Sequence, residues 1–133
     1  MTLLRRFACA AAVAAMLAAG ARLAAHHSAA PFNLTTEKTI AGTVKQWDWT
    51  NPHTWLWLNV PNEKGGVDTW GIEGMSPNYL ARRGWTKSTL KPGDKISVVI
   101  RPMRDGSTGG MFVRATLGDG KVMLQGGQPT DDQ

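Results

Sequence analysis

Residues 47–57 read WDWTNPHTWLW, a stretch that holds four of the six tryptophans and one of the three histidines of the chain. Asn51-Pro52 is a strong turn signal, because asparagine can bond its own backbone and proline keeps the residue before it out of the α region. The Trp-x-Trp pairs on either side have the two-residue period of a β-strand. We therefore predict two strands joined by a tight turn, with His53 at the tip of the loop.

The pairing of these two strands decides where the four indoles lie. Trp47 and Trp49 share one face of the first strand, and Trp55 and Trp57 share one face of the second. If Trp49 pairs with Trp55, all four rings fall on one side of the hairpin, where they bury area and make edge-to-face contacts. A small domain needs large buried side chains, so we expect most tryptophans to lie in the core or to cover the end of a barrel.

Outward from the hairpin, the chain has the pattern of further short strands. Gly42 indicates a bulge or bend in the first strand of the hairpin. In the second strand the aliphatic face, which contains Leu56 and Leu58, is the better candidate for the interior, and Trp55 and Trp57 lie on the other face. The predicted strands cover residues 38–49, 54–60, 67–73, 95–103, 111–117 and 121–124.

Two connections carry specific cap and turn chemistry. Ser76-Pro77 is a helix N-cap followed by a first-turn proline, and Gly84 is a helix stop, so a short helix is expected between them. Residues 91–94 read KPGD, which predicts a type II turn with Pro92 and Gly93 at its centre.

Three strands, a short helix and then two strands predict an all-β domain with one short helix. The expected architecture is a small OB-like five-stranded antiparallel barrel, and a small β-sandwich is the alternative. We expect residues 38–125 to form this domain, residues 26–37 an extended arm docked by Phe32, and residues 126–133 a disordered tail. Such a fold does not determine function, because these barrels bind oligonucleotides, sugars, metals and proteins.

The first residues have the pattern of a secretory signal peptide. Arg5 and Arg6 precede a short, alanine-rich apolar run that ends in small residues. This run is too short to span a bilayer comfortably and no second one follows, so we expect a periplasmic or secreted protein without a membrane span. Cleavage after Ala25, which makes residues 1–25 the signal peptide, would leave His26 first, and cleavage after Ala21 is the alternative.

Removal of this segment changes the charge balance of the chain. The whole sequence has 15 lysines and arginines against 10 acidic residues, but Arg5, Arg6 and Arg22 lie in the removed part, which leaves 12 against 10. No run of basic residues remains, so the electrostatic signature of a nucleic-acid binder is missing. Cys9, the single cysteine, is removed as well, which excludes disulfides and thiolate chemistry from the mature domain.

The chain also resembles an uncharacterised family of small exported bacterial proteins, a domain of unknown function. The resemblance covers most of the mature chain and implies export and domain type, and it brings no activity or substrate. It rests on these motifs, in this order: His26-His27-Ser28, Gly42-Thr43-Val44, Asn51-Pro52-His53, Ser76-Pro77, Gly84-Trp85, Lys91-Pro92-Gly93-Asp94, Arg101-Pro102 and Arg104-Asp105-Gly106.

The three histidines are the candidate metal ligands. If His26 is the mature N-terminus, its α-amine and its ring can chelate one ion together, and the ring of His27 or His53 would complete a planar nitrogen set of the kind that Cu(II) favours. The leading hypothesis is therefore an exported binding module for copper or zinc. Solvated histidines at a cleaved end and a turn-capping His53 are the structural alternative.

A second hypothesis is an interaction domain that binds an envelope protein or a glycan through an aromatic face. Its expected contacts are Trp49, Asn51, Trp55, Arg104 and Asp105. An enzyme is disfavoured, because the sequence has no Gly-x-Ser-x-Gly motif, no serine with a placed base and no acid pair of known separation.

Overall fold

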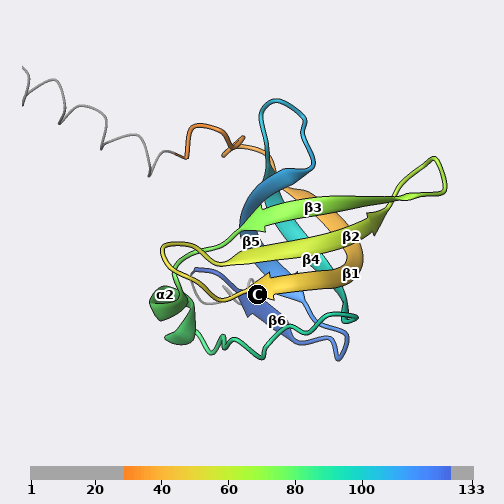
Figure 1. The fold of residues 1–133 in the computed structure, drawn as a ribbon. Helices are drawn as coiled ribbons and strands as arrows, with labels where there is room; N and C mark the ends of the chain where they lie inside the picture. Colours follow the sequence, from red (N-terminus) through yellow and green to blue (C-terminus); the bar gives the residue numbers. More distant parts are fainter. Residues whose placement is uncertain (1–28, 127–133) are drawn as a thin grey trace, which may run out of the picture.

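A computed structural model of the chain describes residues 29–126. The predicted signal peptide, His26, His27 and nearly all of the predicted tail lie outside the described residues. The described chain forms one six-stranded sheet in the order β3-β2-β1-β4-β5-β6, with a further pairing between β3 and β5 that closes it (Figure 1). The elements are β1 (Lys38–Asp48), β2 (Trp55–Pro61), β3 (Val67–Glu73), α2 (Pro77–Ala81), β4 (Lys95–Pro102), β5 (Gly109–Thr116) and β6 (Val122–Leu124).

The closed sheet confirms an OB-like barrel of five strands with one short helix and excludes the β-sandwich. One detail of the prediction is wrong, since the barrel is mixed and not antiparallel throughout: Gly71, Ile72 and Glu73 of β3 run parallel to Gly109–Met111 of β5. An odd number of strands cannot alternate in direction around a closed ring, so one neighbouring pair must be parallel. The sixth strand, β6, pairs with the part of β5 that β3 does not reach.

The core fills the barrel interior with apolar side chains from every strand. Leu56 and Leu58 of β2 are fully buried, which confirms the predicted interior face of this strand. Trp85, which follows α2, is also buried, and its ring meets Phe112 edge-on at a centroid distance of 5.3 Å. Trp70 packs against the core with the amine of Lys38 over its ring, 4.8 Å from the centroid.

The strand β1 bends sharply because it pairs with β2 along one part of its length and with β4 along the other. Thr43 lies where the pairing partner changes, since it is opposite Asn59 of β2 on one side and Lys95 of β4 on the other. The prediction for Gly42 was a bulge or a bend. The bend lies at the next residue, where β1 changes partner, and the bulge lies further on, between Val44 and Gln46. Gly42 instead allows close approach: a Cβ atom there would lie too near the carbonyl oxygen of Asn59 for any ordinary contact.

The predicted cap and turn are both present. The Ser76 hydroxyl accepts a hydrogen bond from the Tyr79 amide, with Pro77 in the first turn of α2. Gly84 has a φ of 83°, a left-handed conformation that suits glycine at a helix end. In the turn at residues 91–94, the Asp94 amide donates to the Lys91 carbonyl at 3.1 Å and Gly93 has a φ of 96°. Local chemistry at these positions therefore fixed the local structure.

The described part of the N-terminal arm lies against the β4–β5 loop. Phe32 is buried and forms an isolated antiparallel bridge with Met103. The Arg104 side chain donates to the Phe32 carbonyl at 2.9 Å, and the Arg104 amide donates to the Pro31 carbonyl at 2.8 Å. Among residues 29–126, no helix is long and apolar enough to cross a membrane.

Candidate functional site

The tryptophan hairpin differs from the prediction in its turn and in its register. Residues 49–54 form a loop between β1 and β2, longer than a tight turn, and the Asn51-Pro52 peptide bond is cis. Asp48 pairs with Trp55 and Trp47 pairs with Leu56, so Trp47 lies on the interior face and Trp55 on the outer face. The expectation that all four indoles share one side is therefore wrong, because the loop and the β1 bulge shift the pairing by one position.

The inner tryptophans extend the core toward α2. The ring of Trp47 lies 5.7 Å from that of Trp49 and 5.8 Å from that of Trp85, centroid to centroid. The Trp47 indole N–H also donates to the Thr86 carbonyl at 3.2 Å. Both rings are half-buried and pack against the core cluster. Four of the six tryptophans, namely Trp47, Trp49, Trp70 and Trp85, therefore lie in the core or pack against it, as expected.

The outer tryptophans form a stacked pair on the outside of the barrel. The rings of Trp55 and Trp57 lie 5.9 Å apart with an interplanar angle of 20°, and neither belongs to the core cluster. The Trp57 ring lies over Gly71 of the neighbouring strand, where a Cβ atom would come within 3.0 Å of it. The absence of a side chain at Gly71 therefore lets this indole lie against the sheet.

Polar side chains on the flanking strands surround this pair. The Trp57 indole N–H donates to Oδ2 of Asp48 at 2.9 Å, and the Gln46 side-chain amide donates to Oδ1 of Asp48 at 2.6 Å. On the other flank, Glu73 lies opposite Trp55 in the pairing of β2 and β3. We call this surface the outer tryptophan face; it consists of Gln46, Asp48, Trp55, Trp57, Gly71 and Glu73.

His53 lies beside this face at the end of the loop. Its Nδ1 lies 3.0 Å from the Gly74 carbonyl oxygen and 3.2 Å from Oε1 of Glu73, and the side chains of His53 and Glu73 are 29% and 26% exposed. Both neighbours are hydrogen-bond acceptors, so Nδ1 carries a proton. The contact thus fixes the orientation of the ring.

The loop itself is anchored to the segment that follows β3. The amide and hydroxyl of Thr54 both donate to the Met75 carbonyl, at 3.2 and 2.9 Å, and the Gly74 amide donates to the Thr54 carbonyl at 2.8 Å. Thr54 is fully buried, whereas Asn51, a predicted contact residue, is exposed on the loop. The anchoring holds one end of the loop while its tip faces solvent.

Of the three predicted metal ligands, the structure describes His53. His26 and His27 lie outside the described residues, and within residues 29–126 no group of three His, Cys, Asp or Glu side chains could hold a metal ion. His53 and Glu73 are the pair of potential ligands that the fold places in contact.

The remaining predicted contact residues, Arg104 and Asp105, are engaged within the chain. Arg104 docks the arm, and the Asp105 carboxylate accepts hydrogen bonds from the hydroxyl and the amide of Ser107, at 2.6 and 2.9 Å. These bonds hold the pKa of the Asp105 carboxyl below its usual value. Both residues therefore stabilise the β4–β5 loop, and this loop contacts β3 where the Gly71 amide donates to the Thr108 carbonyl at 3.2 Å.

Comparison with family models places these features in a known group. Residues 12–113 match the model of a family of unknown function, DUF6152, which spans the hairpin, the helix and the greater part of the barrel. The chain belongs to the DUF6152 family. This agrees with the resemblance to an uncharacterised domain family drawn from the motifs, and the family description names no ligand or reaction.

Further comparisons add little about this DUF6152 protein. No curated protein matches the chain. Among solved structures, it is similar to the crystal structure of the mitochondrial single-stranded DNA-binding protein Rim1 of S. cerevisiae, with a TM-score of 0.46 and 11% sequence identity. The match covers 68% of this chain and 97% of that one.

Of the outer tryptophan face of this DUF6152 protein, sequence reasoning named Trp55 alone as a contact residue and missed Gln46, Asp48, Trp57, Gly71 and Glu73. The signal for Trp57 was present, because an interior that takes Leu56 and Leu58 leaves Trp55 and Trp57 together on the outside. The role of Asp48 as the acceptor for the Trp57 indole could not be read from the sequence. It depends on the cross-strand register of β1 and β2.

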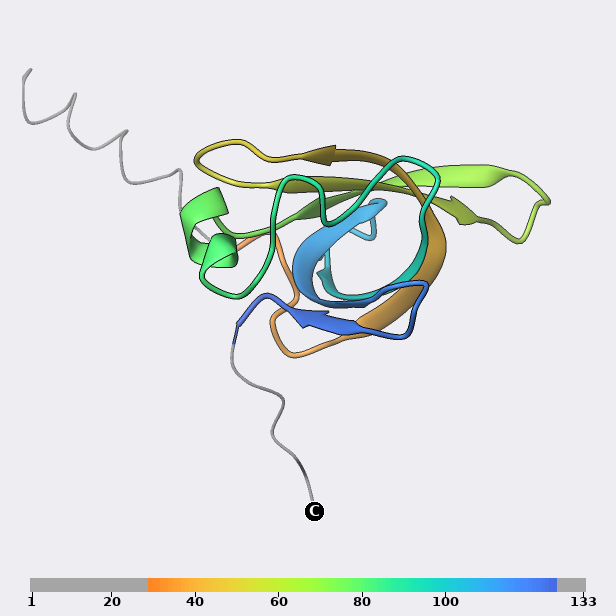
Figure 2. The same ribbon diagram turned by 90° about the horizontal axis from the view of Figure 1, so that it is seen from below.

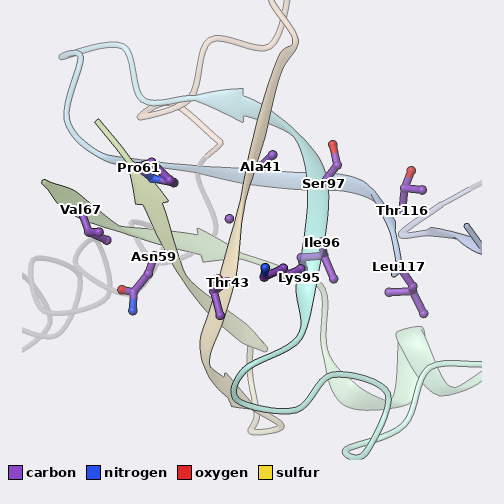
Figure 3. Close-up of a pocket in the computed structure, with 11 residues that line it drawn as sticks. Ala41, Thr43, Asn59, Pro61, Val67, Lys95, Ile96, Ser97, Thr116 and Leu117 are labelled. Atoms are coloured by element: carbon purple, nitrogen blue, oxygen red, sulfur yellow. The ribbon is translucent and has the colours of Figure 1, made fainter. Parts of the chain in front are cut away.

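A separate groove of about 700 Å³ lies beside the middle of β1, where the strand changes its pairing from β4 to β2 (Figure 3). Figure 2 shows why the sheet is concave here, since the β2–β3 hairpin projects beyond the barrel while β1 curves away with β4 and β5. The groove is mostly apolar and is lined by Ala41, Gly42, Thr43, Asn59, Pro61, Val67, Lys95, Ile96, Ser97, Thr116 and Leu117.

Proposed function

We propose that this chain is an exported ligand-binding domain that holds a glycan of the cell envelope against the outer tryptophan face. The stacked pair of Trp55 and Trp57, outside the core and flanked by carboxylates, is the observation that carries the proposal. Large aromatic rings are normally buried by folding, so two adjacent rings that stay outside the core favour a binding role.

The chemistry of the surface favours a neutral, hydroxylated ligand. The apolar C–H faces of sugar rings pack on flat indoles, and sugar hydroxyls can donate to Asp48 and Glu73. The same carboxylates would repel the phosphates of a nucleic acid. The outer face of strands 2 and 3 is also where OB-type barrels bind oligosaccharides and oligonucleotides. A glycan therefore fits this surface better than a nucleic acid does.

Replacing Trp57 with alanine should weaken glycan binding about tenfold or more, because a ring under a stacked ligand contributes about 1–3 kcal/mol. The measurement is a screen of neutral envelope oligosaccharides, followed by NMR titration of the indole N–H signals with the best ligand. Trp57→Phe keeps a ring but loses the bond to Asp48, so we expect an intermediate loss.

Trp49→Phe is the matched control, because Trp49 flanks the same loop but packs on the core side. The affinity of Trp49→Phe for the glycan should equal that of the wild type. The proposal would be refuted if Trp55→Ala and Trp57→Ala both bound the glycan as strongly as the wild type does. It would also be refuted if the ligand shifted only the indole signals of Trp47 and Trp85.

A second candidate function is the binding of copper or zinc through His53 with His26 and His27. The favourable observation is the contact of His53 Nδ1 with Gly74 and Glu73, because metal-ligating histidines usually donate their second ring N–H to a carboxylate or a backbone carbonyl. In this arrangement Nε2 would face the ion, and the α-amine of a mature His26 would complete a nitrogen-rich set.

If this second function holds, native mass spectrometry of protein purified from the periplasm should show a mass that begins at His26 and one retained copper or zinc ion. His53→Ala should abolish retention, and Glu73→Gln should weaken affinity about tenfold or more, because it perturbs the partner that orients the ring. Equal copper retention by wild type and His53→Ala would exclude His53 as a ligand.

A further inference from the structure

The groove beside the middle of β1 has a composition that points to a specific class of ligand. Its floor is made by short side chains, Ala41 and Thr43 on β1 and Ser97 on β4, and its apolar walls include Pro61 and Leu117 (Figure 3). Val67, at its rim, is 60% exposed, the highest value among the large hydrophobic side chains of the described residues. Apolar surface left open in this way is characteristic of a binding surface.

One cation lies in this apolar setting. Lys95 is the single charged residue among those that line the groove, and Figure 3 shows its side chain reaching from β4 toward β1. The two ion pairs of residues 29–126 join His53 to Glu73 and Arg114 to Glu37, so neither neutralises Lys95. The hydroxyls of Thr43, Ser97 and Thr116 supply further polar groups along the groove.

We propose that this groove binds a long-chain fatty acid, with the acyl chain along its apolar side chains and the carboxylate at Lys95. A single-chain amphiphile matches a groove that is mostly apolar and carries one positive charge, and the volume lies within the range of small-molecule sites. A nucleotide or a sugar would leave most of its polar groups without partners here. This site is distinct from the outer tryptophan face, which lies at the opposite ends of β2 and β3.

The test compares laurate with 1-dodecanol, which has the same chain and no charge, by calorimetry and by methyl NMR of the full chain. Laurate should bind and shift the methyl signals of Ala41, Val67 and Leu117, and 1-dodecanol should bind more weakly. Lys95→Gln should weaken laurate binding about two- to fivefold, the range of an exposed ion pair, without changing the affinity for 1-dodecanol. Lys87→Gln, at an exposed lysine that does not line the groove, is the charge control.

Ala41→Phe fills the floor of the groove and should weaken binding of both ligands about tenfold or more. Position 41 is exposed and phenylalanine is favourable in strands, so the fold should be retained. Thr39→Phe is the matched control, since residue 39 is on the same strand face but outside the groove. The proposal would be overturned if laurate failed to bind, or if laurate and 1-dodecanol bound with equal affinity. It would also be overturned if laurate failed to bind and Ala41→Phe dissociated a dimer of the chain, because the groove would then be an interface between two copies.

Discussion

Replacing Trp85 with alanine should lower the free energy of unfolding by about 3–5 kcal/mol, the range for a large aromatic removed from a packed core. Trp85 is 1% exposed and belongs to the core cluster of the barrel. Its ring contacts Phe112 edge-on and Trp47 at a tilt, and its indole N–H donates to the Leu124 carbonyl at 2.8 Å. The substitution therefore removes a ring contact with β1, another with β5, and a hydrogen bond to β6.

Two variants separate these contributions in urea unfolding followed by far-UV circular dichroism. Trp85→Phe keeps much of the volume but loses the donor to Leu124, so we expect a loss of about 1–3 kcal/mol, which includes the cost of an unpaired, partly buried carbonyl. Trp55→Ala, at a half-buried position outside the core, should cost less than about 1 kcal/mol. A Trp85→Ala loss no larger than that of Trp55→Ala would contradict the assignment of Trp85 to the core.

Replacing Gly42 with alanine should cost about 3 kcal/mol, near the upper end of the range for overpacking. The added Cβ atom would collide with the carbonyl oxygen of Asn59 and would lie 3.1 Å from Cγ of Leu58. The obstacle is backbone of the paired strand, which cannot swing aside as the end of a flexible side chain can. We expect β1 and β2 to separate locally, and amide hydrogen exchange at Thr43 and Asn59, which pair across the two strands, should accelerate.

Gly118→Ala is the matched control for this substitution. A Cβ atom at position 118 would meet its nearest neighbour, the Lys95 carbonyl oxygen, at 3.4 Å, and Gly118 is exposed. The stability should change by less than about 0.5 kcal/mol, as at other exposed sites. If Gly42→Ala were as stable as the wild type, β1 would be able to relax away from β2. The close approach of residue 42 to the Asn59 carbonyl would then not require glycine.

Much of the fold followed from local signals. Alternation placed Leu56 and Leu58 in the interior, and the cap at Ser76 and the turn glycine Gly93 lie where their chemistry requires. These features depend on neighbours within a few positions, so a single sequence contains the information. The order of three strands, a helix and two strands was then sufficient to predict an OB-like barrel.

The candidate site was predicted less well, because it depends on register. The hairpin was expected to bring four indoles to one side, but a bulge after Val44 and a loop anchored by Thr54 to Met75 place Trp47 inside and Trp57 outside. The anchor joins residues about twenty positions apart, and its geometry follows from the pairing of β2 with β3. No periodicity in residues 47–57 reports that pairing.

The sequence by itself determined which segments become strands, where the helix begins, and which face of β2 is apolar. Only the tertiary structure decided that Asp48 accepts the Trp57 indole, that Glu73 meets His53, and that a groove opens beside Lys95. The physical reason is that side-chain period and cap chemistry are local. Register, curvature and barrel closure instead arise from contacts between distant residues, such as the approach of Gly42 to Asn59.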